Sequence, residues 1–358
     1  MPVYNFSAGP AALPGAVLAR IGEELGDWQG RGVSVMEVSH RSREFVQLAD
    51  RSEKRLRRLL KVPDKYAVLF MQGGATGQFA AVPLNISQPG EIADFIVSGY
   101  WGEKAVAQSR CYLDPNVIAD GREHDYRRLP ECTPESVDGD AAYVHYTPNE
   151  TIGGVEYRDV PEVGGVPLVA DYSSSLLSEP VDVSRFGVIY AGAQKNIGPA
   201  GLTVVIVSDE LLGRARAETP SVMNYTMLAS AKSMANTPPT FAWYAADLVF
   251  EWLEAEGGLD VIGAQNARKA ALLYNTIDRS DLYHNPVWPA HRSRMNVPFL
   301  LTSPKLENEF LVGAESAGLR YLKGHRSVGG MRASLYNAVP LAAVEALVEY
   351  MREFERRA

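Results

Sequence analysis

Ala191-Gly-Ala-Gln-Lys195-Asn-Ile-Gly-Pro-Ala-Gly-Leu-Thr203 places one lysine between two strongly apolar runs, 187–191 and 202–207. The other eight of the nine lysines stand in polar or helical surroundings. Burying an ammonium is costly unless it is paired or loses its charge. A lysine in this setting therefore indicates chemistry, and imine formation with an aldehyde cofactor is the chemistry that suits it.

The composition is that of an ordinary globular protein, with 46% apolar and 22% charged residues in a chain of 358. This length predicts a large core and two domains. The formal net charge of −8 argues against nucleic acid as a partner, since phosphate binding requires a basic face. An anionic substrate must therefore be bound by a local cluster of arginines.

The two cysteines, Cys111 and Cys132, match no metal or redox spacing, and we expect structural or surface thiols and no metal site. The first ten residues contain no basic segment followed by a long apolar stretch, so no secretory signal is visible. No run approaches the ~18 apolar residues that span a bilayer. We expect a soluble, cytoplasmic protein.

Apolar strand patterns alternate with helical patterns through the first two thirds of the chain, which predicts an α/β sheet that is mostly parallel and covered on both faces. The expected strands are 66–71, 92–97, 141–146, 166–170, 188–191 and 202–207, and the expected helices include 14–27, 43–60 and 240–256.

A separate α+β unit is expected after Gly257-Gly258, with strands near 296–301, 319–322 and 331–335. We therefore expect a large cofactor-binding domain over 15–257 and a small C-terminal domain over 258–358. Residues 1–14, rich in proline and glycine, are expected to pack as an arm against the small domain.

The candidate site residues all follow predicted strands, where ligands bind in open α/β sheets. Gln72-Gly-Gly-Ala-Thr-Gly-Gln78 lies between a strand and a helix and could hold a phosphate on its backbone N–H groups. It matches neither the dinucleotide nor the ATP loop, and an ordinary tight turn is the alternative.

Trp101 follows the strand 92–97, and its indole could stack on a heteroaromatic ring or belong to the core. Asp171 ends the strand 166–170 and could cap the next segment or accept a ring N–H. Its place about two dozen residues before Lys195 favours the second role.

This order resembles the pyridoxal-phosphate enzymes of fold type I, the aspartate-aminotransferase-like fold with a large, mixed, mostly parallel sheet domain and a small α+β domain. Further blocks resemble the phosphoserine aminotransferases, a branch of the class V pyridoxal-phosphate-dependent aminotransferase family. They are Asn5-Phe-Ser-Ala-Gly-Pro10, Glu37-Val-Ser-His-Arg41, Gln78-Phe-Ala-Ala-Val-Pro-Leu-Asn85, His145-Tyr-Thr-Pro-Asn-Glu-Thr151, 191–203, Asn236-Thr-Pro-Pro-Thr-Phe241 and Gly329-Gly-Met-Arg-Ala-Ser334.

The resemblance implies amino transfer from L-glutamate to 3-phosphohydroxypyruvate, with pyridoxal 5'-phosphate as the cofactor. It implies that Lys195 forms the imine with the cofactor and then moves the proton. Asp171 would pair with the ring nitrogen, Trp101 would stack on the ring, and Thr151 would contact the phenolic oxygen.

The same resemblance implies that Ala75, Thr76 and Gln194 hold the cofactor phosphate. Asn236 and Thr237 would reach that phosphate from the other subunit, so a homodimer is expected. Some relatives carry Arg where this chain has Thr76, so the hydroxyl and the helix N-terminus must act here without that charge. Many also have Ser where Ala8 stands.

His-Arg-Ser occurs twice, at 40–42 and 325–327, with Arg332 close to the second copy. Arginine suits bidentate binding of carboxylate and phosphate, and histidine adds donors at low pH. We therefore expect the substrate to be bound by Arg41 and Arg332, with His40, His325 and Arg326 nearby. Surface charges are the alternative.

Three other functions fit these residues less well. A serine–glyoxylate or alanine–glyoxylate aminotransferase shares the fold but would not need the extra Arg/His pair. A cysteine desulfurase needs a mobile cysteine, which neither Cys111 nor Cys132 supplies. A non-catalytic pyridoxal-phosphate-binding protein would not need Lys195.

Overall fold

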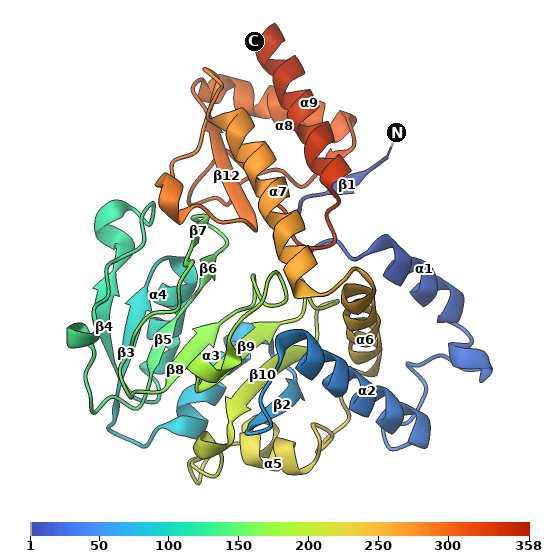
Figure 1. The fold of residues 1–358 in the computed structure, drawn as a ribbon, viewed down its shortest axis with the longest axis vertical. Coiled ribbons are helices and arrows are strands. Elements are labelled where there is room, and N and C mark those ends of the chain that lie inside the picture. The colour runs from blue at the N-terminus through green and yellow to red at the C-terminus, as the bar shows by residue number, and fades with distance from the viewer. Residues whose placement is uncertain (1) are drawn as a thin grey trace.

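A seven-stranded sheet organises the larger part of the molecule, whose computed structural model describes residues 2–358 (Figure 1). Five neighbouring strands are parallel, and β10 runs antiparallel to both of its neighbours. The mixed, mostly parallel sheet predicted from the sequence is thereby confirmed. The strand order is β2 (Tyr66–Met71), β10 (Thr203–Ser208), β9 (Val188–Gly192), β8 (Leu168–Asp171), β5 (Val144–Tyr146), β3 (Ile92–Val97) and β4 (Asp114–Asp120).

Helices cover both faces of this sheet, because its central strands are apolar on both sides. In β10, Val204 and Ile206 face one core, and Val205 and Val207 face the other. The first core includes α2 (Arg43–Leu60) and α6 (Thr240–Ala255), with α1 (Gly15–Glu24) alongside α6; the second includes α3 (Gly74–Ile86), α4 (Tyr100–Ser109) and α5 (Tyr225–Ser230).

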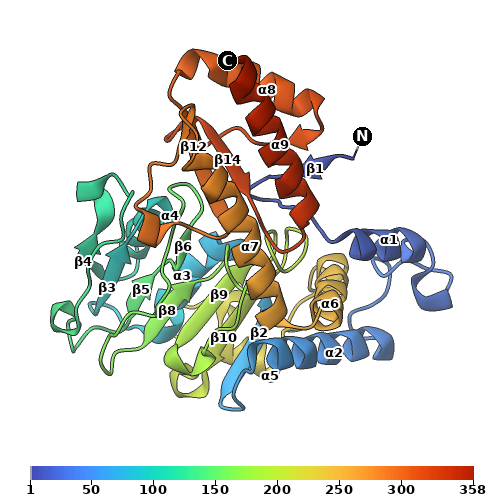
Figure 2. The same cartoon turned by 45° about the horizontal axis from the view of Figure 1, so that its top comes forward.

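The C-terminal part builds a smaller unit with its own apolar core, which stands above the large sheet in Figures 1 and 2. Its antiparallel sheet has the order β11 (Tyr283–His284), β12 (Asn296–Leu301), β14 (Met331–Ser334). Three helices pack on it, α7 (Leu259–Ile277), α8 (Glu307–Ser316) and α9 (Leu341–Arg357).

The N-terminal segment crosses to this smaller unit. Its strand β1 (Tyr4–Asn5) pairs in parallel with β13 (Leu319–Arg320). The backbone N–H of Ala11 then donates to the Gln194 carbonyl at 2.9 Å, beside the lysine turn. The division into 1–14, 15–257 and 258–358 stays a proposal.

The elements agree closely with their sequence patterns where those patterns are strong. The helix predicted over 43–60 and the strand predicted over 92–97 have these bounds in the structure. The strand predicted over 141–146 is shorter, since β5 begins at Val144. The edge strand β4 was not predicted, because Asp-Pro-Asn-Val-Ile-Ala-Asp is largely exposed and lacks an apolar run.

No helix within residues 2–358 is long and apolar enough to cross a membrane. Cys111 is exposed and Cys132 is half-buried, and both thiols are free. In the described part of the chain, no group of histidine, cysteine and carboxylate side chains is arranged to hold a metal ion.

Candidate active site

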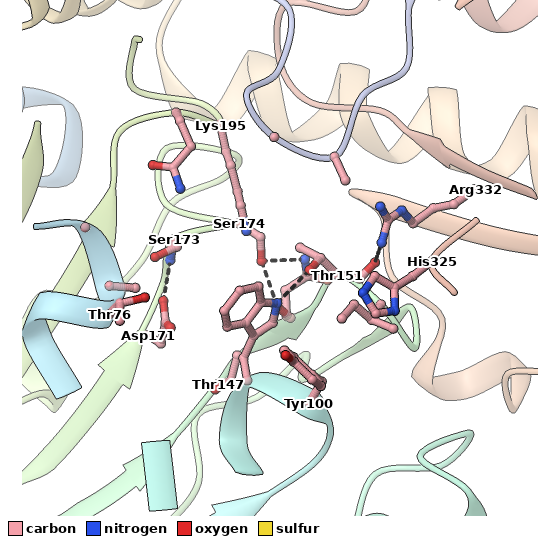
Figure 3. A pocket seen from close by; sticks show the side chains of 18 of the residues that line it. Thr76, Tyr100, Thr147, Thr151, Asp171, Ser173, Ser174, Lys195, His325 and Arg332 are labelled. Atoms are coloured by element: carbon pink, nitrogen blue, oxygen red, sulfur yellow. Dashed lines mark hydrogen bonds between the residues drawn. The ribbon is translucent and has the colours of Figure 1, made fainter. Parts of the chain in front are cut away.

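A cavity of about 460 Å³ lies beyond the carboxyl ends of the sheet strands, bounded by the smaller unit on its other side. Figure 3 shows Lys195, Asp171 and Thr76 on one side of it, and Arg332 and His325 on the other. The predicted site residues that line the cavity are Ala75, Thr76, Trp101, Thr151, Asp171, Gln194, Lys195, His325 and Arg332.

Lys195 stands in the connection over 193–202 between β9 and β10. The connection closes through the bond from Ala193 N–H to the Leu202 carbonyl at 2.9 Å. The Lys195 side chain is half-buried and points into the cavity, with its Nζ 5.8 Å from the centre of the Trp101 ring. Burial lowers the pKa of Lys195 to about 8, against the raising effect of Asp171. The ammonium therefore loses its proton more readily than that of an exposed lysine.

Asp171 is the last residue of β8 and is 4% exposed. Its Oδ1 accepts the backbone N–H of Ser173 at 3.0 Å, which fixes the carboxyl group at the cavity wall. Burial raises the pKa of Asp171, while the Ser173 bonds and Lys195 oppose the shift. A buried carboxyl group held in this way can accept an N–H from a ring in the cavity.

The N-terminus of α3 forms an anion cradle. Gly73 adopts φ +96°, which favours glycine, and a Cβ there would lie 3.4 Å from the Gly77 Cα. The backbone N–H of Gly74 donates to Thr203 Oγ1 at 2.7 Å. Ala75 and Thr76 then begin the helix at the cavity, where free N–H groups and the helix dipole favour a phosphate.

Trp101 and Arg332 are joined through one residue. The indole Nε1 of Trp101 donates to Thr151 Oγ1 at 2.9 Å, and Arg332 Nη1 donates to the Thr151 carbonyl at 3.0 Å (Figure 3). Burial lowers the pKa of Arg332. The guanidinium is thus oriented by a backbone group and keeps further donors for a ligand.

The rim near Arg332 is cationic. Burial lowers the pKa of His325, and Arg332 and Arg326 lower it further. His325 Nδ1 lies 2.7 Å from Ser327 Oγ, and its ring centre lies 5.9 Å from that of Tyr100. The positive charge of Arg332 and the nitrogen donors of His325 suit a ligand that carries negative charge.

Several predicted site residues do not line the cavity of this chain, and Arg41 and Arg326 are exposed. The Thr237 carbonyl nevertheless accepts Gln72 Nε2 at 3.3 Å, one residue before the anion cradle. The predicted residues away from the cavity are His40, Arg41, Asn236, Thr237 and Arg326.

Other lining residues were not singled out from the sequence. Most of them are adjacent to a predicted residue or belong to a quoted block, whereas Ser173 and Ser174 follow Asp171 by two and three positions. Asn149 Nδ2 donates to Ser174 Oγ at 2.8 Å, which ties two of them together. The lining residues without a predicted role include Gly9, Tyr100, Thr147, Asn149, Ser173 and Ser174.

The model of the family described as "Aminotransferase class-V" matches residues 3–347. The chain belongs to the class V aminotransferase family. The family, the enzyme class and the fold predicted from the sequence are confirmed by this match and by the similarities that follow.

A phosphoserine aminotransferase of Pseudomonas paraeruginosa is 57% identical over 353 residues, which cover 99% of this chain and 98% of that protein. The solved structure of a phosphoserine aminotransferase from Bacillus circulans subsp. alkalophilus is similar with a TM-score of 0.96 and 43% identity, over 99% of both chains. The PLP-bound enzyme of Trichomonas vaginalis gives a TM-score of 0.91 and 38% identity, over 98% of this chain and 100% of that one.

Proposed function

We propose that this member of the class V family is a phosphoserine aminotransferase. It transfers the amino group of L-glutamate to 3-phosphohydroxypyruvate, giving O-phospho-L-serine and 2-oxoglutarate in serine biosynthesis. The observation that carries the proposal is the Lys195 ammonium, which shares one cavity with the Asp171 carboxyl group and the guanidinium of Arg332. The names of the 54–57% identical relatives support the same reaction.

The residues present fit pyridoxal phosphate. The α3 cradle suits the phosphate, and Asp171 suits the protonated ring nitrogen. The glycine at position 192 leaves room for the Gln194 side chain at this cradle. A Cβ there would lie 2.6 Å from Gln194 Oε1 and displace that side chain. When bound, the cofactor supplies the aldehyde that takes up the amino group and the ring that accepts electron density.

The chain's own groups bind, orient and move a proton. Lys195 Nζ would supply the amine that holds the cofactor and would accept and return the substrate proton. Asp171 would keep the ring nitrogen protonated. Trp101 would cover one face of the ring and exclude water, and the Thr151 hydroxyl would contact the phenolic oxygen. Thr76, Gln194 and Ala75 would hold the phosphate.

Substrate selection is proposed to lie in the cationic rim. Arg332 holds the carboxylate, since its guanidinium is oriented by Thr151 and free on the cavity side. His325 and Arg326 would bind the substrate's second anionic group. Of the five predicted substrate-binding residues, Arg332 and His325 line the cavity of this chain, so the second anionic group needs further donors from elsewhere.

We further propose a homodimer in which His40 and Arg41 bind the distal anion in the second copy's site. Asn236 and Thr237 reach that copy's cofactor phosphate. These residues lie outside the cavity of their own chain, and Arg41, Asn236 and Thr237 are exposed. A cytoplasmic location stays a prediction.

The test is a two-stage assay. The purified protein is loaded with pyridoxal phosphate and treated with glutamate, and the change in cofactor absorbance reports the first half-reaction. The enzyme that has taken up the amino group is then offered 3-phosphohydroxypyruvate or glyoxylate as the acceptor. We expect turnover with the phosphorylated acceptor to be at least tenfold faster, because Arg41 and His40 bind only that acceptor's phosphate.

Faster turnover with glyoxylate would indicate an aminotransferase of the glyoxylate type. Cofactor binding without a glutamate half-reaction would indicate a non-catalytic binding protein. A wild-type protein that stays colourless with added pyridoxal phosphate would refute the cofactor assignment.

A further inference from the structure

Glu150 is buried behind the cavity wall and has no role in the proposed function. It is 0% exposed, ends the short strand β6 (Asn149–Glu150) and does not line the cavity. Its Oε2 accepts the backbone N–H of Trp101 at 3.1 Å, and its Oε1 accepts that of Gly102 at 2.9 Å. Both oxygens therefore satisfy free N–H groups in the first turn of α4.

The glycine at position 99 is explained by this contact, and the glycine at position 102 by the backbone of Val97. A Cβ at Gly99 would lie 2.6 Å from the Cδ of Glu150, a distance at which one of the two must move. A Cβ at Gly102 would lie 3.2 Å from the Val97 Cα and 3.7 Å from Glu150 Oε1. Ser98-Gly-Tyr-Trp-Gly102 thus leaves room for a carboxylate against the backbone that carries the indole.

The next residue, Thr151, holds the other end of the same tryptophan. Its hydroxyl accepts the indole N–H of Trp101, and its carbonyl accepts Arg332. Glu150 at the end of β6 and Thr151 in the turn that follows therefore fix the backbone and the ring of Trp101. The guanidinium of Arg332 is oriented by the same segment.

We propose that Glu150 is a positioning residue, which holds the first turn of α4 against β6 and thereby fixes the Trp101 ring over the cavity. This inference rests on the proposed function, because the ring position matters for a stacked cofactor. The bidentate contact with two N–H groups at a helix N-terminus favours the carboxylate form.

The surroundings of Glu150 show why its charge matters. Burial raises the pKa of Glu150 to about 7, and the bonds from Gly102 and Trp101 oppose that shift. Asp171 raises the pKa further, and Lys195 lowers it. A neutral amide at this position would place an NH₂ group against a backbone N–H and lose one of the two bonds.

The experiment compares Glu150→Gln with the wild type and with Glu103→Gln. Glu103 stands on the same helix but bonds Arg122 and Tyr126, so it controls for removal of a carboxylate from α4. We expect Glu150→Gln to raise the dissociation constant of pyridoxal phosphate about tenfold, as for one lost charge-assisted bond. The induced circular dichroism of the bound cofactor should fall, and Glu103→Gln should match the wild type.

Two further variants separate positioning from general stability. Gly99→Ala should weaken cofactor binding in the same direction, because its Cβ displaces the Glu150 carboxylate without removing it. In a Trp101→Ala background, Glu150→Gln should have little further effect on cofactor affinity, since the ring that it positions is gone.

The inference is overturned if Glu150→Gln or Gly99→Ala binds cofactor with wild-type affinity and dichroism while only its melting temperature falls. Additive losses in the Trp101→Ala background also overturn it. A wild type that binds no pyridoxal phosphate refutes the proposed function instead, so the two failures are distinguishable.

Discussion

Two lysines of this chain lie in low-polarity surroundings, and they differ in what their ammonium groups meet. Lys269 on α7 is 3% exposed and donates to the carbonyls of Leu335, Tyr336 and Val339, each at 2.9 Å. Lys195 points into a cavity, and its Nζ faces the ring of Trp101 at 5.8 Å.

Burial lowers the pKa of both lysines, so a lowered pKa does not separate them. Three short bonds to carbonyls use every N–H of the Lys269 ammonium and join α7 to the segment after β14. Lys195 has free donors and space beside them. A buried lysine therefore indicates a catalytic role when its ammonium faces a cavity, and a structural role when all its N–H groups are hydrogen-bonded.

The largest effect is expected from Lys195→Ala. Amino transfer should fall by about 10⁴-fold, because the amine that forms the covalent link and moves the proton is lost. The free energy of unfolding of the cofactor-free protein should change by less than about 1 kcal/mol, because removal of the Lys195 side chain leaves no hydrogen-bond partner unsatisfied. Single-turnover kinetics and urea unfolding measure the two quantities, and a large loss of stability would contradict the contrast.

Lys269→Met should give the opposite result. Removing the ammonium leaves three buried carbonyls without their donor, and we expect a loss of about 3 to 5 kcal/mol in unfolding free energy. Arg268→Ala, on the exposed side of the same helix, is the control and should change stability by less than about 0.5 kcal/mol. Urea unfolding of the cofactor-free proteins tests this, and equal stability of the two variants would show that the three bonds contribute nothing net.

The next effect concerns pH. The pKa of Lys195 is lowered to about 8, so its nucleophilic neutral form becomes the major form as the pH rises through 8. Labelling of the cofactor-free protein with an amine-reactive acylating reagent should therefore show a midpoint near pH 8 at Lys195. Lys269 should stay unlabelled in the folded protein, because it is buried and its donors are used. Peptide mass spectrometry measures both sites, and fast labelling of Lys269 would contradict its structural role.

The sequence predicted that Lys195, Asp171 and Trp101 meet at one site, because each follows an apolar strand, and all three line the cavity. Their roles toward a cofactor stay predictions. It did not distinguish Lys269, since a helical pattern does not show which carbonyls a distant loop brings to it. The bonds of Asn149, Ser173 and Ser174 were missed for the same reason, as small polar residues after strands carry no periodic signal.

The sequence also gave no sign of Glu150, although it stands in a quoted block. Its role depends on how β6 lies against α4, which no local pattern encodes. The edge strand β4 was missed because exposed edge strands lack the apolar run that marks central ones. His40, Arg41, Asn236 and Thr237 lie away from the cavity of their own chain, so their roles remain proposals that a single chain does not test.

The smallest expected effect concerns the charges around Lys195. Asp171 raises its pKa and Arg332 lowers it, with Asp171 the larger influence. Asp171→Asn should therefore move the labelling midpoint of Lys195 below pH 8, and Arg332→Gln should move it above 8 by a smaller amount. Neither substitution should change the protection of Lys269, whose surroundings are carbonyl groups of the smaller unit. Shifts of the same sign in the two variants would mean that a change of structure, and not charge, controls the reactivity of Lys195.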